Sequence, residues 1–143
     1  MRKVLDEVDL QILSLLRKNA RMPLKDISSE VHLTAPALSA RIGKLEQEGY
    51  IKGYHADVDL EKTGYNVKAY VQTSVLPEDH KDFLSFVKKK RCVIECSHIT
   101  GEFSMMLKVV FRSTSDLDKF ITELQAFGKT ETEIVFSTLI ERH

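Results

Sequence analysis

Apolar residues in the first third of the chain recur at intervals of three and four, the spacing of one buried face of an α-helix. A break at residues 19–23 and a tight connection at residues 32–34 divide this region into three predicted helices. Thr34 can cap the third helix with its hydroxyl group, and Gly49 ends that helix. The apolar stripes are Leu5, Val8, Ile12, Leu15 and Leu16, then Leu24, Ile27 and Val31, and finally Leu38, Ile42 and Leu45.

The pattern changes after Gly49. Residues 50–58 alternate loosely around a central glycine, which is typical of a small hairpin or wing. Residues 61–66 hold a glycine among mostly polar side chains and indicate a linker. We therefore expect a winged helix-turn-helix domain at residues 1–60, a linker at 61–66 and a second domain at 67–143.

The second half alternates strands and helices. Strands are predicted at residues 67–76, 92–100, 103–111 and 132–140, with a tight turn at Gly101–Glu102. One helix is expected after Pro77, and another near Ser115, where Ser115 to Asp118 resembles a capping box. The order strand-helix-strand, repeated twice, predicts an α+β fold. Its second domain is a ferredoxin-like βαββαβ sandwich, a four-stranded antiparallel sheet with both helices on one face.

Such a sheet leaves one face without helices. Several strand residues are too apolar for both faces to be in water, and a second copy of the sheet could cover the open face. We therefore expect a homodimer. The residues that carry this expectation are Ala69, Val71, Val109, Val135 and Leu139.

Composition narrows the class of protein. The chain is 43% hydrophobic and 29% charged, which is typical of a globular domain. No apolar run approaches the ~18 residues of a membrane span, and the charged N-terminus is unlike a secretory signal. We therefore expect a cytoplasmic protein that does not enter a membrane. Cys92 and Cys96 fit neither a redox motif nor a zinc set, so we interpret them as small buried apolar groups.

The five histidines show no ligand spacing along a helix or strand, and no phosphate loop, nucleophile elbow or paired carboxylates occur. The sequence thus predicts no metal ion and no cofactor.

Charge leaves nucleic-acid binding open. The chain holds 21 Lys and Arg against 21 Asp and Glu, whereas most nucleic-acid binders are basic. DNA binding would therefore need cations arranged locally or multiplied by oligomerisation. The basic run KKKR, Lys88 to Arg91, is expected to end a helix, where cations complement the helix dipole.

Several stretches carry a resemblance to a known family. "LDEVDLQILSLLRKNARMPLKDIS" and "LSARIGKLEQEGYIKGYHADVD" in the first half, with "HITGEFSMMLKV" and "TEIVFSTLI" in the second, resemble the leucine-responsive/asparagine-regulator (Lrp/AsnC) family of prokaryotic transcription factors. The similarity covers essentially the whole chain. It implies a transcriptional regulator rather than an enzyme, with double-stranded DNA as one partner. It also implies homodimers that assemble further, to octamers, and a small effector, often an amino acid.

In a helix-turn-helix the N-terminal residues of the third helix face base edges in the major groove. Here these residues are small, and bidentate reading of guanine needs Arg or Lys, so we expect sequence-tolerant binding that depends on DNA shape. Four cations are expected to contact phosphates. The reading positions are Thr34, Ala35, Pro36, Ala37, Ser39 and Ala40, and the phosphate positions are Lys25, Arg41, Lys44 and Lys52.

The resemblance also places the effector between dimers, near the turn at residues 99–104. Gly101 would let backbone amides approach a ligand carboxylate. The family commonly has Asp where this chain has Ser104, and Glu102 could partly replace that charge. The expected effector residues are His98, Thr100, Gly101, Glu102, Phe103, Ser104, Thr132 and Ile134.

Two other functions remain open. Some relatives of the same architecture decarboxylate siroheme with His and Arg around the pocket, and His98 and Arg112 keep such an enzyme possible. The other is a metabolite-binding oligomer with weak DNA binding.

Overall fold

The computed structural model describes residues 4–142, which form two compact units. The first comprises the described residues up to Asp57 together with Arg142, and the second runs from Val58 to Glu141. No helix in the described part of the chain is long and apolar enough to cross a membrane.

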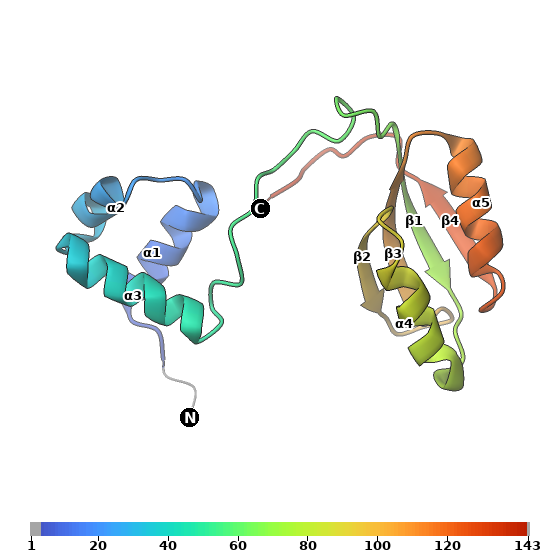
Figure 1. The fold of residues 1–143 in the computed structure, drawn as a ribbon, viewed down its shortest axis with the longest axis horizontal. Coiled ribbons are helices and arrows are strands. Elements are labelled where there is room, and N and C mark those ends of the chain that lie inside the picture. Colours follow the sequence, from blue (N-terminus) through green and yellow to red (C-terminus); the bar gives the residue numbers. More distant parts are fainter. Residues whose placement is uncertain (1–3, 143) are drawn as a thin grey trace. The chain divides into compact units, whose positions relative to one another are not determined.

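The first unit consists of three helices, α1 (Glu7–Lys18), α2 (Leu24–Val31) and α3 (Ala35–Gln47) (Figure 1). Thr34 caps α3 as predicted, because its hydroxyl accepts a hydrogen bond from the Ala37 amide at 3.4 Å. The turn between α2 and α3 passes through His32, whose φ of 54° is left-handed. The core of this unit is small, with one or two fully buried side chains from each helix: Ile12, Ile27, Val31, Leu38 and Leu45.

The hairpin expected at residues 50–58 is not formed, because this segment contains no strand. Ile51 alone in it packs against the helical core, and the residues from Lys52 to Leu60 are exposed. A hairpin here would bury no apolar face, so nothing offsets the entropy of pairing two strands.

The second unit has the predicted α+β fold. Its strands are β1 (Val67–Thr73), β2 (Val93–His98), β3 (Met105–Phe111) and β4 (Thr130–Ile134). They pair antiparallel in the order β2-β3-β1-β4. A short 3-10 turn, η1 (Pro77–Asp79), leads into α4 (His80–Lys88), and α5 (Thr114–Leu124) precedes β4. Both helices pack on one face of the sheet (Figure 1).

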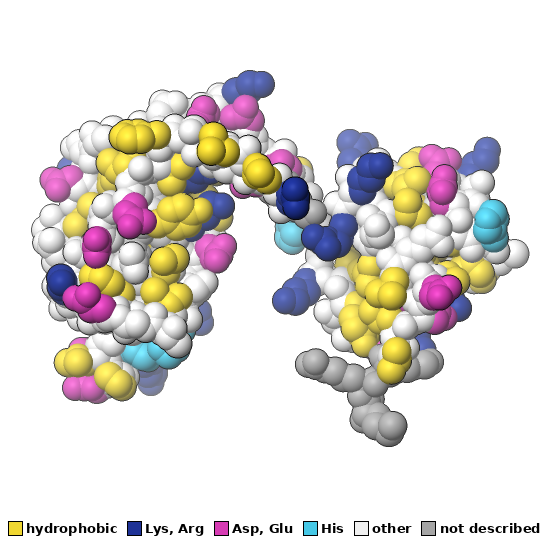
Figure 2. Space-filling view, turned by 180° about the vertical axis from the view of Figure 1, so that it is seen from behind, with side chains coloured by type: hydrophobic (Ala, Val, Ile, Leu, Met, Phe, Trp, Pro, Cys, Tyr) yellow, Lys and Arg dark blue, Asp and Glu magenta, His cyan; other side chains and the backbone are white. Residues whose placement is uncertain are grey.

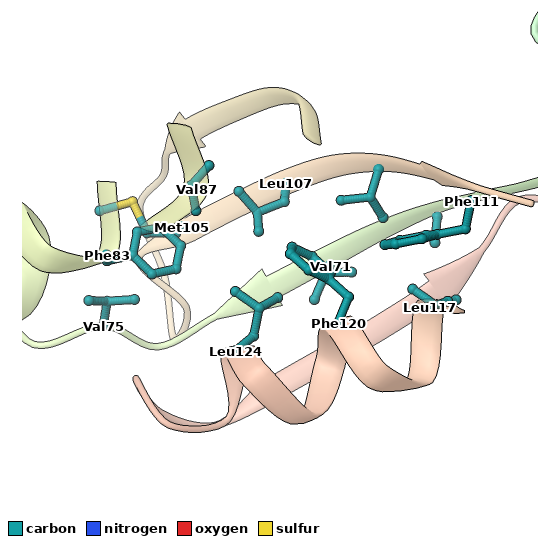
Figure 3. Packing of buried hydrophobic residues seen from close by; sticks show 12 residues of the cluster. Val71, Val75, Phe83, Val87, Met105, Leu107, Phe111, Leu117, Phe120 and Leu124 are labelled. Carbon is teal, nitrogen blue, oxygen red and sulfur yellow. The ribbon is translucent and has the colours of Figure 1, made fainter. Parts of the chain in front are cut away.

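The core of this unit lies between the sheet and its helices. Figure 3 shows Val71 and Leu107 from the sheet meeting Phe83 and Val87 of α4 and Leu124 of α5. This packing corrects one expectation. The residues Ala69, Val71 and Val109 belong to this helix-covered core, and Val135 and Leu139 follow the end of β4.

The open face is therefore more polar than the sequence suggested. On β1 and β3 this face carries the residues that alternate with the core residues. Val110 is buried, and the others are half-buried: Lys68, Tyr70, Gln72, Met106 and Lys108.

Local details differ from the predicted ends. The N-cap of α5 is Ser113, whose hydroxyl accepts from the Asp116 amide at 3.2 Å, so the cap lies two residues before the predicted Ser115. Cys92 and Cys96 are half-buried free thiols packed against the core, where burial raises the pKa of both.

Candidate nucleic-acid interface and effector loop

The N-terminal half of α3 presents small side chains to solvent. The side chain of Leu38 points into the helical core and is fully buried, whereas its neighbours on the outer side are exposed. Ala37 is half-buried, and the exposed group comprises Thr34, Ala35, Pro36, Ser39 and Ala40. These exposed residues thus offer methyl and hydroxyl groups and no long polar side chain.

Three of the four predicted phosphate contacts are exposed lysines. Lys25 on α2 and Lys52 after α3 form no ion pair with any described residue, and Lys44 lies 3.9 Å from the Glu48 carboxylate. On the face seen in Figure 2, Lys and Arg side chains of the helical unit lie apart rather than in one continuous patch. The cations on that face of the helical unit are therefore spread out.

Arg41 differs from these lysines because it is already paired. Its Nη1 donates to Asp6 at 2.6 Å and to Asp9 at 2.9 Å, which ties the middle of α3 to the start of α1. The pairing lowers the pKa of Asp6, with the Arg41 hydrogen bond as the main cause, and raises the pKa of Arg41. A phosphate contact by Arg41 would have to compete with these two carboxylates.

Asp6 and Asp9 also form the capping box of α1. The Asp6 carboxylate accepts from the Asp9 amide at 2.8 Å, and the Asp9 carboxylate accepts from the Asp6 amide at 3.3 Å. A cavity of about 360 Å³ lies beside this cluster and continues along α3 to Lys44 and Glu48. Arg41 thus serves the fold of the helical unit as well as its surface.

Ser104 fastens the predicted effector loop, residues 98–104, to the backbone of Val75. Its hydroxyl accepts from the Val75 amide at 2.9 Å and donates to the Val75 carbonyl at 3.1 Å. The Ile99 amide donates to the Ser104 carbonyl at 2.8 Å, which closes the turn around Gly101 with its φ of 113°. At the position where the resemblance leads us to expect a carboxylate, this chain therefore has a hydroxyl that fastens the loop to the end of β1.

Glu102, the expected substitute for the missing carboxylate, is also engaged. It pairs with Lys129 at 2.9 Å, and the Lys129 ammonium lies 5.5 Å from the centre of the Phe103 ring. The hydrogen bond that the Lys129 ammonium donates to Glu102 raises the pKa of Lys129. Phe103 itself is buried, and Thr100 is exposed beside Gly101.

Thr132 and Ile134 lie farther along the sheet. The loop meets β4 near Thr130, the cross-strand partner of Thr73. At a rise of ~3.3 Å per residue, Thr132 is about 7 Å and Ile134 about 13 Å beyond that point. A single chain thus brings residues 98–104 together and leaves these two positions apart from them.

His98 and Arg112 lie at opposite ends of β3. His98 is the partner of Met105 at the start of β3, and Arg112 follows its end, where the guanidinium stacks on Tyr65 at 4.9 Å. Seven residues of strand separate the two ends by about 23 Å. One chain therefore does not assemble the His and Arg pair that the siroheme hypothesis requires.

The structure reveals one neighbour of the loop that the sequence analysis did not single out. His80, the first residue of α4, lies beside His98, with ring centroids 5.3 Å apart. The two residues are 18 positions apart, so no local spacing pairs them. Packing of α4 against β2 does.

Comparison with known proteins follows the division into two units. A family model for winged helix-turn-helix DNA-binding matches residues 5–52, and a model for the Lrp/AsnC ligand binding domain matches residues 68–143. The HTH-type transcriptional regulator YezC of Bacillus subtilis is 36% identical over 94% of this chain and 95% of its own length.

Solved structures agree in fold. B. subtilis LrpC superposes with a TM-score of 0.91 at 28% identity, covering 98% of this chain and all of that one. The regulator NMB0573 of Neisseria meningitidis, solved as a complex with L-Met, gives a TM-score of 0.91 at 23% identity. That match covers 97% of this chain and 94% of the other.

Proposed function

The chain belongs to the Lrp/AsnC family of DNA-binding transcriptional regulators, and we propose that it is a sequence-tolerant member that an amino acid controls. In this proposal α3 enters the major groove, Lys25, Lys44 and Lys52 contact phosphates, and the sheet unit assembles copies and binds the effector. The observation that carries the proposal is the exposed row of small side chains on α3.

Small side chains limit direct reading of bases. The Ala and Thr methyl groups can contact thymine methyls, whereas the bidentate contacts that identify guanine or adenine need Arg, Lys, Asn or Gln. In the first turns of α3 there is none of these before Arg41, which Asp6 and Asp9 hold. Preference among sequences then comes mainly from the shape and bending of the duplex.

Assembly compensates for the weak local charge. Residues 1–55 hold nine Lys and Arg against seven Asp and Glu, a net charge of +2. Two such units on one duplex gain affinity through effective concentration. We propose that a second copy covers the open face of the sheet, where Val110 and half-buried Tyr70 and Met106 offer apolar surface. Larger rings, up to octamers, follow from contacts between dimers.

We place the effector at residues 98–104, with Thr132 and Ile134 as contacts made across dimers. Gly101 has open space around its Cα, so a ligand carboxylate can approach the backbone there. Because Ser104 and Glu102 already have partners, a second copy must supply what holds the ligand ammonium. The L-Met complex of the Neisseria regulator makes amino acids the first class to test.

Fluorescence anisotropy on a panel of AT-rich and GC-rich duplexes tests the DNA proposal. Lys25→Ala with Lys52→Ala should weaken binding to all duplexes by a similar factor and reduce the slope of log affinity against log salt by about 2. Ala40→Arg, on the exposed row, should change the order of preference. If the lysine variant reorders the panel while Ala40→Arg leaves the order unchanged, the assigned roles are wrong.

Calorimetry over the twenty amino acids tests the effector. Binding should be lost in Gly101→Val, whose side chain would occupy the open space, and should be retained in Gly43→Ala in the helical unit. Absence of heat from every amino acid, with the protein folded and oligomeric, would remove the amino-acid effector and leave DNA binding untouched.

A further inference from the structure

His80 and His98 form a pair at one corner of the sheet unit. His80 begins α4, and His98 is the last residue of β2. Their ring centroids are 5.3 Å apart, and the ring planes meet at 76°. Neither ring forms an ion pair with a carboxylate in the part of the chain that the structure describes. The two imidazoles therefore lie edge to face, and neither has a carboxylate partner among these ion pairs.

One ring nitrogen of His80 already has a hydrogen-bond partner. Its Nε2 lies 3.2 Å from the Val75 carbonyl oxygen, and a carbonyl can only accept. The proton of neutral His80 therefore sits on Nε2, which leaves the lone pair of Nδ1 free. Imidazoles that bind metals commonly donate their second N–H to a backbone carbonyl in this way, because that bond fixes the tautomer and the ring orientation.

The separation of the rings matches a shared ion. Zinc–nitrogen bonds of ~2.1 Å at a tetrahedral angle hold the centres of two imidazole rings about 5 Å apart. Within residues 4–142 no group of three or more His, Cys, Asp or Glu side chains is placed to hold a metal. Two protein ligands would leave the other coordination positions to water.

We propose that His80 and His98 bind one divalent transition-metal ion of the Zn²⁺, Ni²⁺ or Cu²⁺ class, with His80 coordinating through Nδ1 and water completing the shell. Imidazole suits all three ions, and their relative affinities follow the general order in which Cu²⁺ binds most tightly. The bound ion cross-links the start of α4 to the end of β2.

The site adjoins the turn at residues 99–104 through Val75. The Val75 carbonyl accepts from both His80 and Ser104, and His98 directly precedes the turn. The ion therefore restrains the base of that turn. The proposal does not depend on DNA binding or on any effector.

Calorimetric titration of the full chain with ZnCl₂ at pH 7.5 tests the site. The wild type should bind one Zn²⁺ per chain with a Kd in the micromolar range. His98→Ala and His80→Gln should each weaken this binding at least tenfold, and the double variant should be little weaker than either. Gln at position 80 can still donate to the Val75 carbonyl, so this variant keeps the local fold.

His32→Ala and His55→Ala are the matched controls, because both histidines are exposed and lie outside the sheet unit's core. They should bind Zn²⁺ as the wild type does. Nitrogen-15 NMR of the imidazoles adds a structural readout, in which Zn²⁺ should shift Nδ1 of His80 and leave its Nε2 protonated. No binding below millimolar Zn²⁺, or equal binding by His80→Gln and His98→Ala, would overturn the proposal.

Discussion

The two candidate surfaces of this protein differ in what their side chains already do. The exposed row on α3 contributes little to the fold beyond the Thr34 cap, while Leu38 beside it fills the core. In the loop at residues 98–104, Ser104 and Glu102 have partners in other strands or loops, and Phe103 is buried. One surface is free for a ligand, and the other is part of the structure.

This difference predicts that binding and stability can be changed separately on one surface and only together on the other. Substitution on the α3 row should change binding and leave the free energy of unfolding nearly unchanged. Substitution in the loop or at its base should change both, because the same groups that would meet an effector hold the sheet together. Two loop variants, each with a matched control on α3, test this contrast, and two further variants test the helical unit alone.

The largest effect is expected at Gly128, at the base of the loop. A Cβ there would lie 1.8 Å from the Ser74 carbonyl oxygen, and Gly128 has a φ of 155°. The Ser74 amide also donates to the Lys129 carbonyl at 2.9 Å, so the backbone cannot easily move away. Gly128→Ala should destabilise the sheet unit by about 3 kcal/mol or more, as measured by urea unfolding.

Gly43→Ala is the matched control on α3. Nothing lies within 4 Å of its added Cβ, and alanine in a helix interior is favoured over glycine by about 0.5–1 kcal/mol. This variant should be as stable as the wild type or more so. A Gly128→Ala protein within 1 kcal/mol of the wild type would show that the loop base is not rigid.

Ser104→Ala should give the next largest effect. The substitution removes the partner of the Val75 amide, and an unmet backbone donor of this kind costs about 1–2 kcal/mol. Ser39→Ala on α3 should change stability by less than ~0.5 kcal/mol, because Ser39 is exposed. Thermal unfolding measures the stability of both serine variants. If they lose equal stability, the proposed contrast between the two surfaces is wrong.

His32→Gly should change stability by a smaller amount, and in the opposite direction, as a gain. A left-handed φ of 54° is unfavourable for a residue with a Cβ and free for glycine, so the variant should stabilise the helical unit by roughly 0.5–1 kcal/mol. The order of DNA preference should stay the same. A loss of stability, measured by thermal unfolding, would mean that the His32 side chain has a structural role of its own.

The smallest effect is expected from the Arg41 pairs. The pKa of Asp6 is lowered from 3.8 in the folded state, so its contribution to stability is complete above that value. The contribution is lost as the pH falls through the lowered pKa. Acid unfolding of the helical unit should therefore be less steep in Arg41→Met. Indistinguishable acid profiles would show that the pairs add nothing measurable.

Much of the fold was predictable because it depends on local periodicity. Stripes such as Ile12 with Leu15 and Leu16 specify helices, and the alternation of β1 and β3 specifies strands. Alternation does not tell which face the helices cover, so Ala69 and Val71 were assigned to the wrong face. The register of β1 with β3 and the packing of α4 and α5 decide that question.

The candidate sites were harder to predict for the same reason. The exposed α3 row follows from one helix and its own period. The partners of Arg41, Ser104 and His98 lie 18 to 35 positions away in sequence, and only tertiary packing brings them together. Residue types alone therefore indicated cations, a hydroxyl and an imidazole without showing which were already engaged.

The carboxylate of Asp6 couples two events that would otherwise be independent. It accepts both the Asp9 amide that starts α1 and the guanidinium from α3, so release of Arg41 removes one restraint on the first turn of α1. A DNA phosphate that drew Arg41 away would leave the start of α1 less protected. Hydrogen exchange at the Asp9 amide in α1 would then report that DNA is bound, although α3 and not α1 is the helix proposed to enter the major groove.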